Sequence, residues 1–293
     1  MTDKPFDVSQ ITGHTFEPFT FSYTERDVCL YALAVGAPAD WLNQDDLSFV
    51  YELSGQGFKA LPTFPVLYPT RMIDHILGGR LGQIEFNPMM LVHGEQYLEI
   101  KKTIPTAGQI TCRPRIANIF DKGSGMLVIT ETPCYDESGE EVAFNQSSMF
   151  IRGLGNFGGE RGPSGQSEPI PDRAPDAVQR ETTLEKQALL YRLCGDRNPL
   201  HADPAMAAIG NFDRPILHGL CTFGFAGRAV LKHFCDNNPA RFKSIKVRFA
   251  RHVFPGETLR TEMWKQDNRV IFRTRVEERG EDVLTHASVE LND

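Results

Sequence analysis

The feature that most limits the fold of this chain is a stretch rich in glycine, proline and polar residues between two halves of similar length. It covers residues 153–178 of the 293, and this composition predicts a linker, not a helix or strand. We therefore expect an N-terminal half over residues 1–152 and a C-terminal half over residues 179–293. Two halves of this kind are to be compared for internal duplication.

The two halves contain the same order of predicted elements. Each begins with an amphipathic helix that ends at a glycine, at 23–36 and at 183–195, as helix C-caps commonly do. Each continues with strand-like runs separated by turn residues. These runs lie at 96–102, 109–119, 125–132 and 141–151, and then at 244–249, 258–264, 269–276 and 283–291. A helix followed by an antiparallel meander, twice over, predicts an α+β architecture with an internal pseudo-repeat.

The halves differ in the region between the first helix and the strands. Residues 215–235 are apolar nearly all the way round, which predicts a helix buried on most sides, with Pro215 at its first position. The corresponding region, 61–77, has prolines at 62, 65 and 69, and no continuous helix survives that spacing. We expect apolar space where this helix is degraded. Filling of the space by loops and large side chains is the alternative.

Composition excludes several classes of protein. A net charge of −7 and a pI near 5.7 argue against nucleic acid as a partner. No apolar run reaches the roughly 18–20 residues of a membrane helix. The six cysteines form no Cys-x-x-Cys pair, so neither a disulfide framework nor a metal site is expected. With no signal-like start and no Ser-Lys-Leu-type ending, we expect a cytoplasmic protein.

The stretch richest in reactive side chains is Gly195-Asp-Arg-Asn-Pro-Leu-His-Ala-Asp-Pro204. One helix is predicted to end at its first residue and another to begin at its last two, so Asp196, Asn198 and His201 share a short loop. A carboxylate and an imidazole held together can activate a water molecule. The matching residues 36–41 of the first half lack the pattern. Because a purely structural cap would be expected in both halves, this asymmetry favours function.

A second candidate group is the backbone of Gly219, within Pro215-Ile-Leu-His-Gly-Leu-Cys221. In the first turn of a helix the amide N–H groups have no intrahelical partner, and the helix dipole is positive there. A glycine lets a substrate carbonyl approach closely, so we predict an oxyanion-hole donor. Close packing is the alternative, and it is favoured for Gly224 and Gly227. His218 is either a second base or a structural residue.

These stretches resemble a known family. Tyr191-Arg-Leu-Cys-Gly-Asp-Arg-Asn-Pro-Leu-His201, followed by Pro215-Ile-Leu-His-Gly-Leu-Cys-Thr-Phe-Gly224, is similar to the signature of type-2, (R)-specific enoyl-CoA hydratases. These are MaoC-like domains that also occur in peroxisomal multifunctional enzymes. The likeness extends over almost the whole chain, through further blocks at 49–52, 61–64, 93–99, 121–125, 171–178 and 254–259.

The resemblance implies a double hot dog fold, in which each half is an antiparallel sheet wrapped around a helix and the first helix is degraded. It implies a hydro-lyase of fatty acid metabolism, including β-oxidation, that reversibly hydrates trans-2-enoyl-CoA to (3R)-3-hydroxyacyl-CoA. No cofactor is implied, since the CoA thioester is the substrate. The first half would accommodate the acyl chain in its apolar space, and the second would carry the catalytic loop.

The resemblance also implies roles for individual residues. Asp196 and His201 would hold and activate the water, with Asn198 assisting, and Gly219 would bind the thioester oxygen. A further catalytic glutamate would be Glu52. Substrate or CoA contacts are implied at a second set of positions, namely His93, Gly94, Lys122, Gly219 and Phe249.

Other readings stay open at this point. An acyl-CoA thioesterase uses the same type of fold but does not need the loop at 195–204. A non-catalytic acyl-CoA-binding protein is the third reading, and the intact loop argues against it. A homodimer is compatible with the sequence, and a peroxisomal location is the alternative to a cytoplasmic one.

Overall fold

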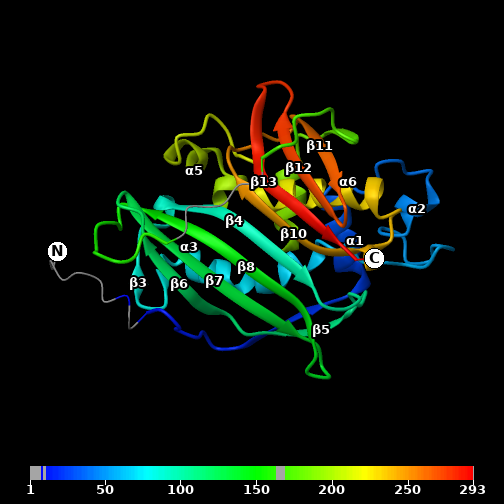
Figure 1. The fold of residues 1–293 in the computed structure, drawn as a ribbon. Helices are drawn as coiled ribbons and strands as arrows, with labels where there is room; N and C mark the ends of the chain where they lie inside the picture. Colours follow the sequence, from blue (N-terminus) through cyan, green and yellow to red (C-terminus); the bar gives the residue numbers. More distant parts are fainter. Residues whose placement is uncertain (1–7, 9–10, 163–168, 293) are drawn as a thin grey trace.

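The computed structural model describes residues 8, 11–162 and 169–292, and one antiparallel sheet runs through both halves of this part of the chain (Figure 1). Its strand order is β1-β5-β7-β8-β4-β10-β13-β12-β11-β9, with β6 paired to β7. Antiparallel strands with a few helices confirm the α+β class. The strands are β1 (Phe19–Tyr23), β4 (Leu91–Ile100), β5 (Gly108–Cys112), β6 (Arg115–Asp121), β7 (Gly125–Tyr135), β8 (Glu141–Arg152), β9 (Ala177–Thr182), β10 (Phe242–Phe249), β11 (Thr258–Gln266), β12 (Arg269–Val276) and β13 (Glu281–Leu291), with a separate small pair, β2 (Arg80–Leu81) and β3 (Ile84–Glu85).

The sheet is symmetric about the pair β4–β10, which joins the two halves. On either side of this pair, β8 corresponds to β13, β7 to β12 and β1 to β9. The junction itself is antiparallel, with registered pairs running from Ser244–Glu99 to Arg248–Glu95. The pseudo-repeat predicted from the sequence is therefore confirmed, and its halves share one hydrogen-bonded sheet.

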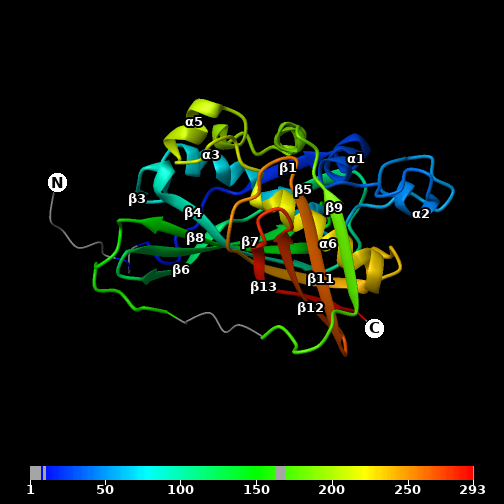
Figure 2. The same cartoon turned by 90° about the horizontal axis from the view of Figure 1, so that it is seen from above.

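Short helices gather along one side of the sheet, where Figure 2 shows α5, α3, α1 and α2. None of the helices in the described ranges is both long and apolar enough to cross a membrane. The helical elements are α1 (Glu25–Ala34), α2 (Gln44–Leu47), η2 (Phe64–Arg71), α3 (Met72–Leu77), η3 (Pro88–Met90), α4 (Gln187–Tyr191), η4 (Arg192–Cys194), η5 (Pro199–His201), α5 (Pro204–Ile209), α6 (Gly219–Phe234) and η6 (Pro239–Arg241).

Helix α6 is the buried helix of the second half and packs against β10, β11, β12 and β13. Every residue from Cys221 to Leu231 is buried, as its apolar sequence predicts. At Gly224 an added Cβ would lie 2.4 Å from Val35, just beyond α1, so this glycine permits close packing. The predicted packing role of Gly224 is confirmed.

The predicted start of this helix was wrong. Residues 215–217 are not helical, and α6 begins at Gly219 after the N-cap His218. Ile216 and Leu217 instead make hydrogen bonds to distant residues. The Leu217 N–H donates to the Val253 carbonyl at 2.7 Å, and the Ile216 carbonyl accepts from the His201 ring at 2.8 Å.

The first half has no continuous helix at the matching place, as predicted. A 3-10 helix, η2, leads into α3, and the backbone is non-helical at Pro69. Its side chains Phe64, Val66, Leu67 and Tyr68 are buried, and η2 contacts β1, β5 and β8. These side chains occupy space in the region where we expected it to be empty. Acyl-chain accommodation in the first half stays a prediction.

Several predicted boundaries need correction. The run 109–119 is two strands, β5 and β6, separated at Arg113 and Pro114, because proline cannot donate to the ladder. The edge strands β1 and β9 were missed. The second predicted helix is shorter than 183–195, since α4 begins only at Gln187.

The linker predicted over 153–178 also changes. Its last residues, Ala177 and Val178, belong to β9 and pair with Met263 and Glu262. Residues 163–168 lie outside the described part of the chain. Its first ten residues return to the β6–β7 turn, where the Gly153 N–H donates to the Ser124 carbonyl at 2.9 Å.

Candidate active site

The loop between α4 and α5 is built from short local hydrogen bonds. Gly195 has a φ of +127°, which favours glycine, and it reverses the chain after η4. The Asp196 carboxylate accepts the Asn198 N–H at 3.0 Å, and the Asn198 side chain accepts the Leu200 N–H at 3.0 Å as N-cap of η5. These contacts bring Asp196 and His201 onto the same side of one turn.

Asp196, His201 and His218 form a tight cluster, with one side-chain donor atom of each lying within 4.8 Å of the others. His201 is only 9% exposed, and its Nδ1 lies 2.8 Å from the Ile216 carbonyl oxygen. A carbonyl can only accept, so Nδ1 carries the hydrogen. The lone pair of His201 therefore sits on Nε2, where it can take a proton from water.

Burial lowers the pKa of His201 below 6.5, although the charge of Asp196 and the Ile216 carbonyl oppose this shift. The ring is therefore neutral at physiological pH and is available as a base. The sequence reasoning missed Ile216 altogether. It acts through its backbone, so its side chain carries no signal.

His218 lies directly against His201, with ring centroids 3.8 Å apart and an angle of 29° between the planes. Its Nε2 is 3.3 Å from the Asp196 carbonyl oxygen, to which it donates. Burial, and secondarily the neighbouring His201, hold the pKa of His218 well below its ordinary value. The lone pair of His218 is then on Nδ1, which is buried and has no partner among the described residues. Because Nδ1 is shielded from solvent, the geometry favours a supporting role over that of a second base.

The three donor groups do not fit a metal site, although they are close enough together. The two imidazole rings are stacked, so their in-plane lone pairs run side by side and do not converge on one point. The Nδ1 of His201 is also occupied by a carbonyl. Metal ligation requires lone pairs directed at a common centre.

The amide of Gly219 lies beside this cluster. Gly219 is the first residue of α6 and is exposed, and amides at this position have no intrahelical partner. A Cβ at Gly219 would lie 3.1 Å from the ring of Phe249 in β10. Phe249 in turn packs on His93 of β4, with ring centroids 4.7 Å apart. The structure thus brings together Gly219, Phe249 and His93 where the two halves meet.

The neighbouring Gly94 lies at an irregularity of β4, where the pairing with β8 shifts register between His93 and Glu95. A Cβ at Gly94 would lie 3.3 Å from the Ser148 carbonyl oxygen. His93 has a buried Nε2 with no partner among the described residues. Burial lowers the pKa of His93 to about 4.

The other two predicted residues lie in a turn and a loop of the first half. Lys122 is in the turn between β6 and β7, and its ammonium lies 5.8 Å from the centroid of the Phe120 ring. Glu52 is an exposed residue of the loop after α2. Its carboxylate faces the Cys29 thiol of α1, and burial together with this charge raises the pKa of Cys29 to about 11. The catalytic role of Glu52 stays a prediction.

A cleft of about 530 Å³ reaches His201 from the side of α4. Its lining includes apolar and charged residues, among them Ala188, Leu189, Arg214, Pro215 and Gly256. Ala188 and Leu189 lie within the helix predicted over 183–195, and no sequence pattern marks them as cleft residues. His201 is therefore accessible from solvent through this cleft, which is lined by α4 and by the segment before α6.

Comparison with known proteins identifies relatives of both halves. Residues 21–153 match the family described as MFE-2 hydratase 2 N-terminal domain, and residues 166–287 match the family described as MaoC like domain. The chain is 47% identical over 283 residues to a probable enoyl-CoA hydratase 2 of Dictyostelium discoideum, covering 95% of this chain and 94% of that protein. It is 47% identical over 285 residues to the mouse peroxisomal multifunctional enzyme type 2, covering 95% of this chain but only 38% of that enzyme.

Solved structures agree in fold. The crystal structure of a MaoC-like dehydratase from Phytophthora capsici superposes with a TM-score of 0.87 at 36% identity, covering 98% of each chain. A Mycobacterium tuberculosis protein described as having a double hotdog fold gives a TM-score of 0.59 at 14% identity, covering 96% of each chain, which bears on the fold alone. The double hot dog prediction is confirmed.

Because His93 is held neutral by burial, we expect the free energy of unfolding to decrease as the pH falls from 6.5 toward 4. In the unfolded chain a histidine titrates near 6.5, whereas the pKa of His93 in the fold is about 4. Between these values the unfolded state binds more protons than the folded state. His93 therefore lowers the free energy of unfolding by up to about 1.4 kcal/mol for each unit by which the pH falls. Above pH 6.5 this loss of stability is absent. Urea unfolding at several pH values measures this slope.

The substitution His93→Gln should make the slope shallower. The matched control is His75→Gln, at an exposed residue of α3, which should keep the slope of the unmodified protein. Equal slopes in the unmodified chain and in the His93 variant would contradict the assignment.

Proposed function

The chain belongs to the MaoC-like, hydratase 2 family, and from this premise we propose that it adds water to trans-2-enoyl-CoA, giving (3R)-3-hydroxyacyl-CoA. The observation that carries the proposal is the arrangement of three groups. The side chains of Asp196 and His201 lie together. The ring of His218 is stacked on that of His201, and the next residue, Gly219, presents the first amide of α6.

The first step uses the backbone of α6. The Gly219 N–H donates to the thioester carbonyl oxygen, and the positive end of the helix stabilises the charge that develops there. Withdrawal of electrons toward this oxygen makes C3 of the enoyl group electrophilic. A glycine is suited to this place, since the neighbouring Phe249 ring leaves little room for a side chain.

The second step uses the loop. A water molecule between Asp196 and the Nε2 of His201 loses a proton to this pair as its oxygen forms a bond to C3. The double-bond electrons move toward the thioester, and the Asp196–His201 pair then gives a proton to C2 on the same face, which restores the pair to its starting state. Asn198 assists by fixing the start of η5 through its bond to Leu200. No electrons leave the substrate, so the reaction needs no redox cofactor.

The remaining residues would position the thioester. His93, Gly94 and Phe249 would contact it where the halves meet, and the Lys122 ammonium would interact with the phosphates of CoA. The first half would accommodate the acyl chain, and Glu52 would act from its loop. The homodimer and the cytoplasmic location stay predictions, and several relatives are named as peroxisomal.

The activity is tested with trans-2-enoyl-CoA and the purified chain. We expect the absorbance of the conjugated thioester to fall, because the double bond is consumed. The product should be oxidised by a dehydrogenase specific for (3R)-hydroxyacyl-CoA and not by one specific for the (3S) form. Release of free CoA thiol would instead indicate a thioesterase. Unchanged absorbance in both directions of the reaction would indicate a binding protein.

Asp196→Asn and His201→Gln should each lower kcat by about 10²–10⁴-fold, the usual contribution of general acid/base catalysis. The matched control is Asp203→Asn in the same loop. Asp203 is the N-cap of α5, where its carboxylate accepts the Ala205 N–H at 2.8 Å, and asparagine caps equally well. Steady-state kinetics should give a near-normal kcat for the control. A near-normal kcat in either of the first two variants would remove them from the mechanism.

Gly219→Pro should lower kcat by about 10²–10³-fold, the typical cost of losing one oxyanion donor. Proline removes the N–H and adds a ring beside Phe249. The helix itself tolerates it, because proline is favoured at the first helical position and the preceding His218 already has the extended backbone that it needs. Gly219→Ala is the control, since it adds the Cβ near Phe249 but keeps the N–H. Stopped-flow measurement of the chemical step should separate the two variants. Equal loss in both would point to steric effects and not to a hydrogen bond.

A further inference from the structure

Asp121 ends β6 with a side chain that is only 7% exposed. Its carboxylate is surrounded by backbone amides from two segments. Oδ1 accepts the N–H of Gly123 at 2.8 Å and of Asn156 at 2.9 Å, and Oδ2 accepts the N–H of Gly158 at 2.9 Å. The carboxylate thus fastens the turn that contains Lys122 to the start of the linker.

Both carboxylate oxygens are needed for this arrangement. The amide donors, the Gly123 N–H foremost, lower the pKa of Asp121 despite its burial, so the group is ionised at neutral pH. Hydrogen bonds to a charged acceptor are stronger than those between neutral groups. An asparagine in this place has one oxygen instead of two and carries no charge.

The start of the linker is fitted closely to the same turn. A Cβ on Gly155 would lie 2.0 Å from the Gly123 carbonyl oxygen, so only glycine permits this approach. The Asp121 N–H donates to the Glu160 carbonyl at 2.8 Å, and the Lys122 N–H donates to the Gly125 carbonyl at 3.0 Å. The backbone on either side of Lys122 is therefore held from both directions.

The turn lies at a defined distance from the thioester site. His93, Met149, Val128 and Ile119 are aligned across β4, β8, β7 and β6. Three steps between neighbouring strands amount to roughly 14 Å. In a CoA thioester the pantetheine arm separates the thioester from the phosphates, so a cation several strands from His93 is placed for a phosphate.

We propose that Asp121 is a positioning residue for CoA recognition, which fixes the turn and the linker start so that Lys122 meets the phosphates of the thioester substrate. The proposal rests on the hydratase function proposed above. A lysine is a point charge on a flexible stem, so its backbone sets the region that the ammonium can reach. Asp121 contacts no reacting atom in this role.

The test compares two substrates in the full-length chain, an enoyl-CoA and the corresponding enoyl-pantetheine thioester, which has no phosphate. Asp121→Asn should raise KM for the enoyl-CoA roughly tenfold, the effect of about 1.4 kcal/mol. It should leave kcat within about twofold, since the Asp196 cluster is untouched. For the pantetheine thioester neither constant should change. Lys122→Gln should give the same selective increase.

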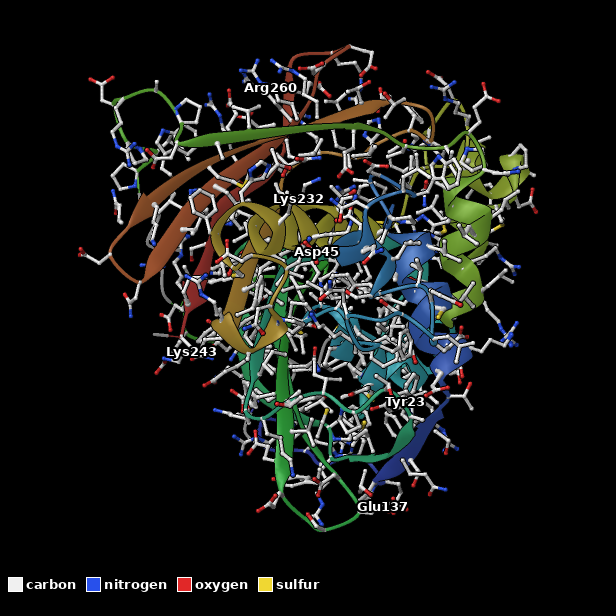
Figure 3. All side chains as sticks on the ribbon, turned by 90° about the vertical axis from the view of Figure 1, so that its right-hand side faces the viewer. Tyr23, Asp45, Glu137, Lys232, Lys243 and Arg260 are labelled. Atoms are coloured by element: carbon white, nitrogen blue, oxygen red, sulfur yellow. The ribbon has the colours of Figure 1, made fainter. Side chains whose placement is uncertain are left out.

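The matched control is Asp136→Asn. Asp136 holds the β7–β8 turn in the same way, since its Oδ1 accepts the N–H groups of Ser138 at 3.0 Å and Glu140 at 3.1 Å. This turn, in which Figure 3 labels Glu137, lies at the opposite end of β7 from Lys122. The control should leave KM for both substrates unchanged, whatever it costs in stability.

A second variant keeps the proposal testable if Asp121→Asn fails to fold. Gly155→Ala keeps Asp121 but forces the linker away from the turn, and it should also raise KM for the enoyl-CoA alone. The proposal is overturned if the Asp121 and Gly155 variants, checked for folding by circular dichroism, raise KM equally for both substrates or leave both unchanged. Calorimetric titration measures the affinity for CoA and for pantetheine directly, without any reaction. It therefore distinguishes a failure of the Asp121 proposal from a failure of the hydratase proposal. A weakened affinity for CoA alone would support the role of Asp121 even in a protein that hydrates nothing.

Discussion

The antiparallel pairing of β4 with β10 is the constraint on which the site depends. It joins the halves into one sheet, with Glu95 opposite Arg248 at the end of the registered pairs. Immediately beyond that pair, His93 of one half and Phe249 of the other come into ring contact. The start of α6 lies against the same phenylalanine. The contact surface that we propose for a thioester is thus formed by residues of both halves.

One short segment, residues 215–218, supports both of the chemical functions that we propose for the site. It remains outside α6 because its backbone is used elsewhere, by Val253 and by His201. The bond from Ile216 fixes the tautomer of His201, and ending the segment at His218 leaves the Gly219 amide as the first of the helix. Ile216 and Leu217 make these hydrogen bonds in place of helical ones, so these backbone polar groups remain satisfied. The same bonds orient the His201 ring relative to the Gly219 amide.

The sequence was most informative where contacts are local. Hydrogen bonds two residues apart join Asp196 to Asn198 and Asn198 to Leu200, directly before His201. Such Asx-type contacts can be anticipated from residue type and spacing. The start of α6 was misplaced because a contact with Val253, far along the chain, decided it. Edge strands β1 and β9 are short and half exposed, so their alternation was weak. His93 and Phe249 could be suggested only by resemblance, since no local pattern shows which strands become neighbours.

The asymmetry of the two halves has a physical use beyond the loss of one helix. The end of α1 in the first half offers the Ala34 carbonyl, which accepts from Gln187 of α4 at 2.7 Å and from the Cys221 thiol of α6 at 3.3 Å. Thr70 of η2 lies 3.4 Å from where a Cβ on Gly195 would be. Helices α4 and α6 are therefore tied to one carbonyl of the first half, and the loop that begins at Gly195 packs on η2. Because a loop alone places side chains loosely, these contacts from the first half help to hold the proposed catalytic pair, Asp196 and His201, in position.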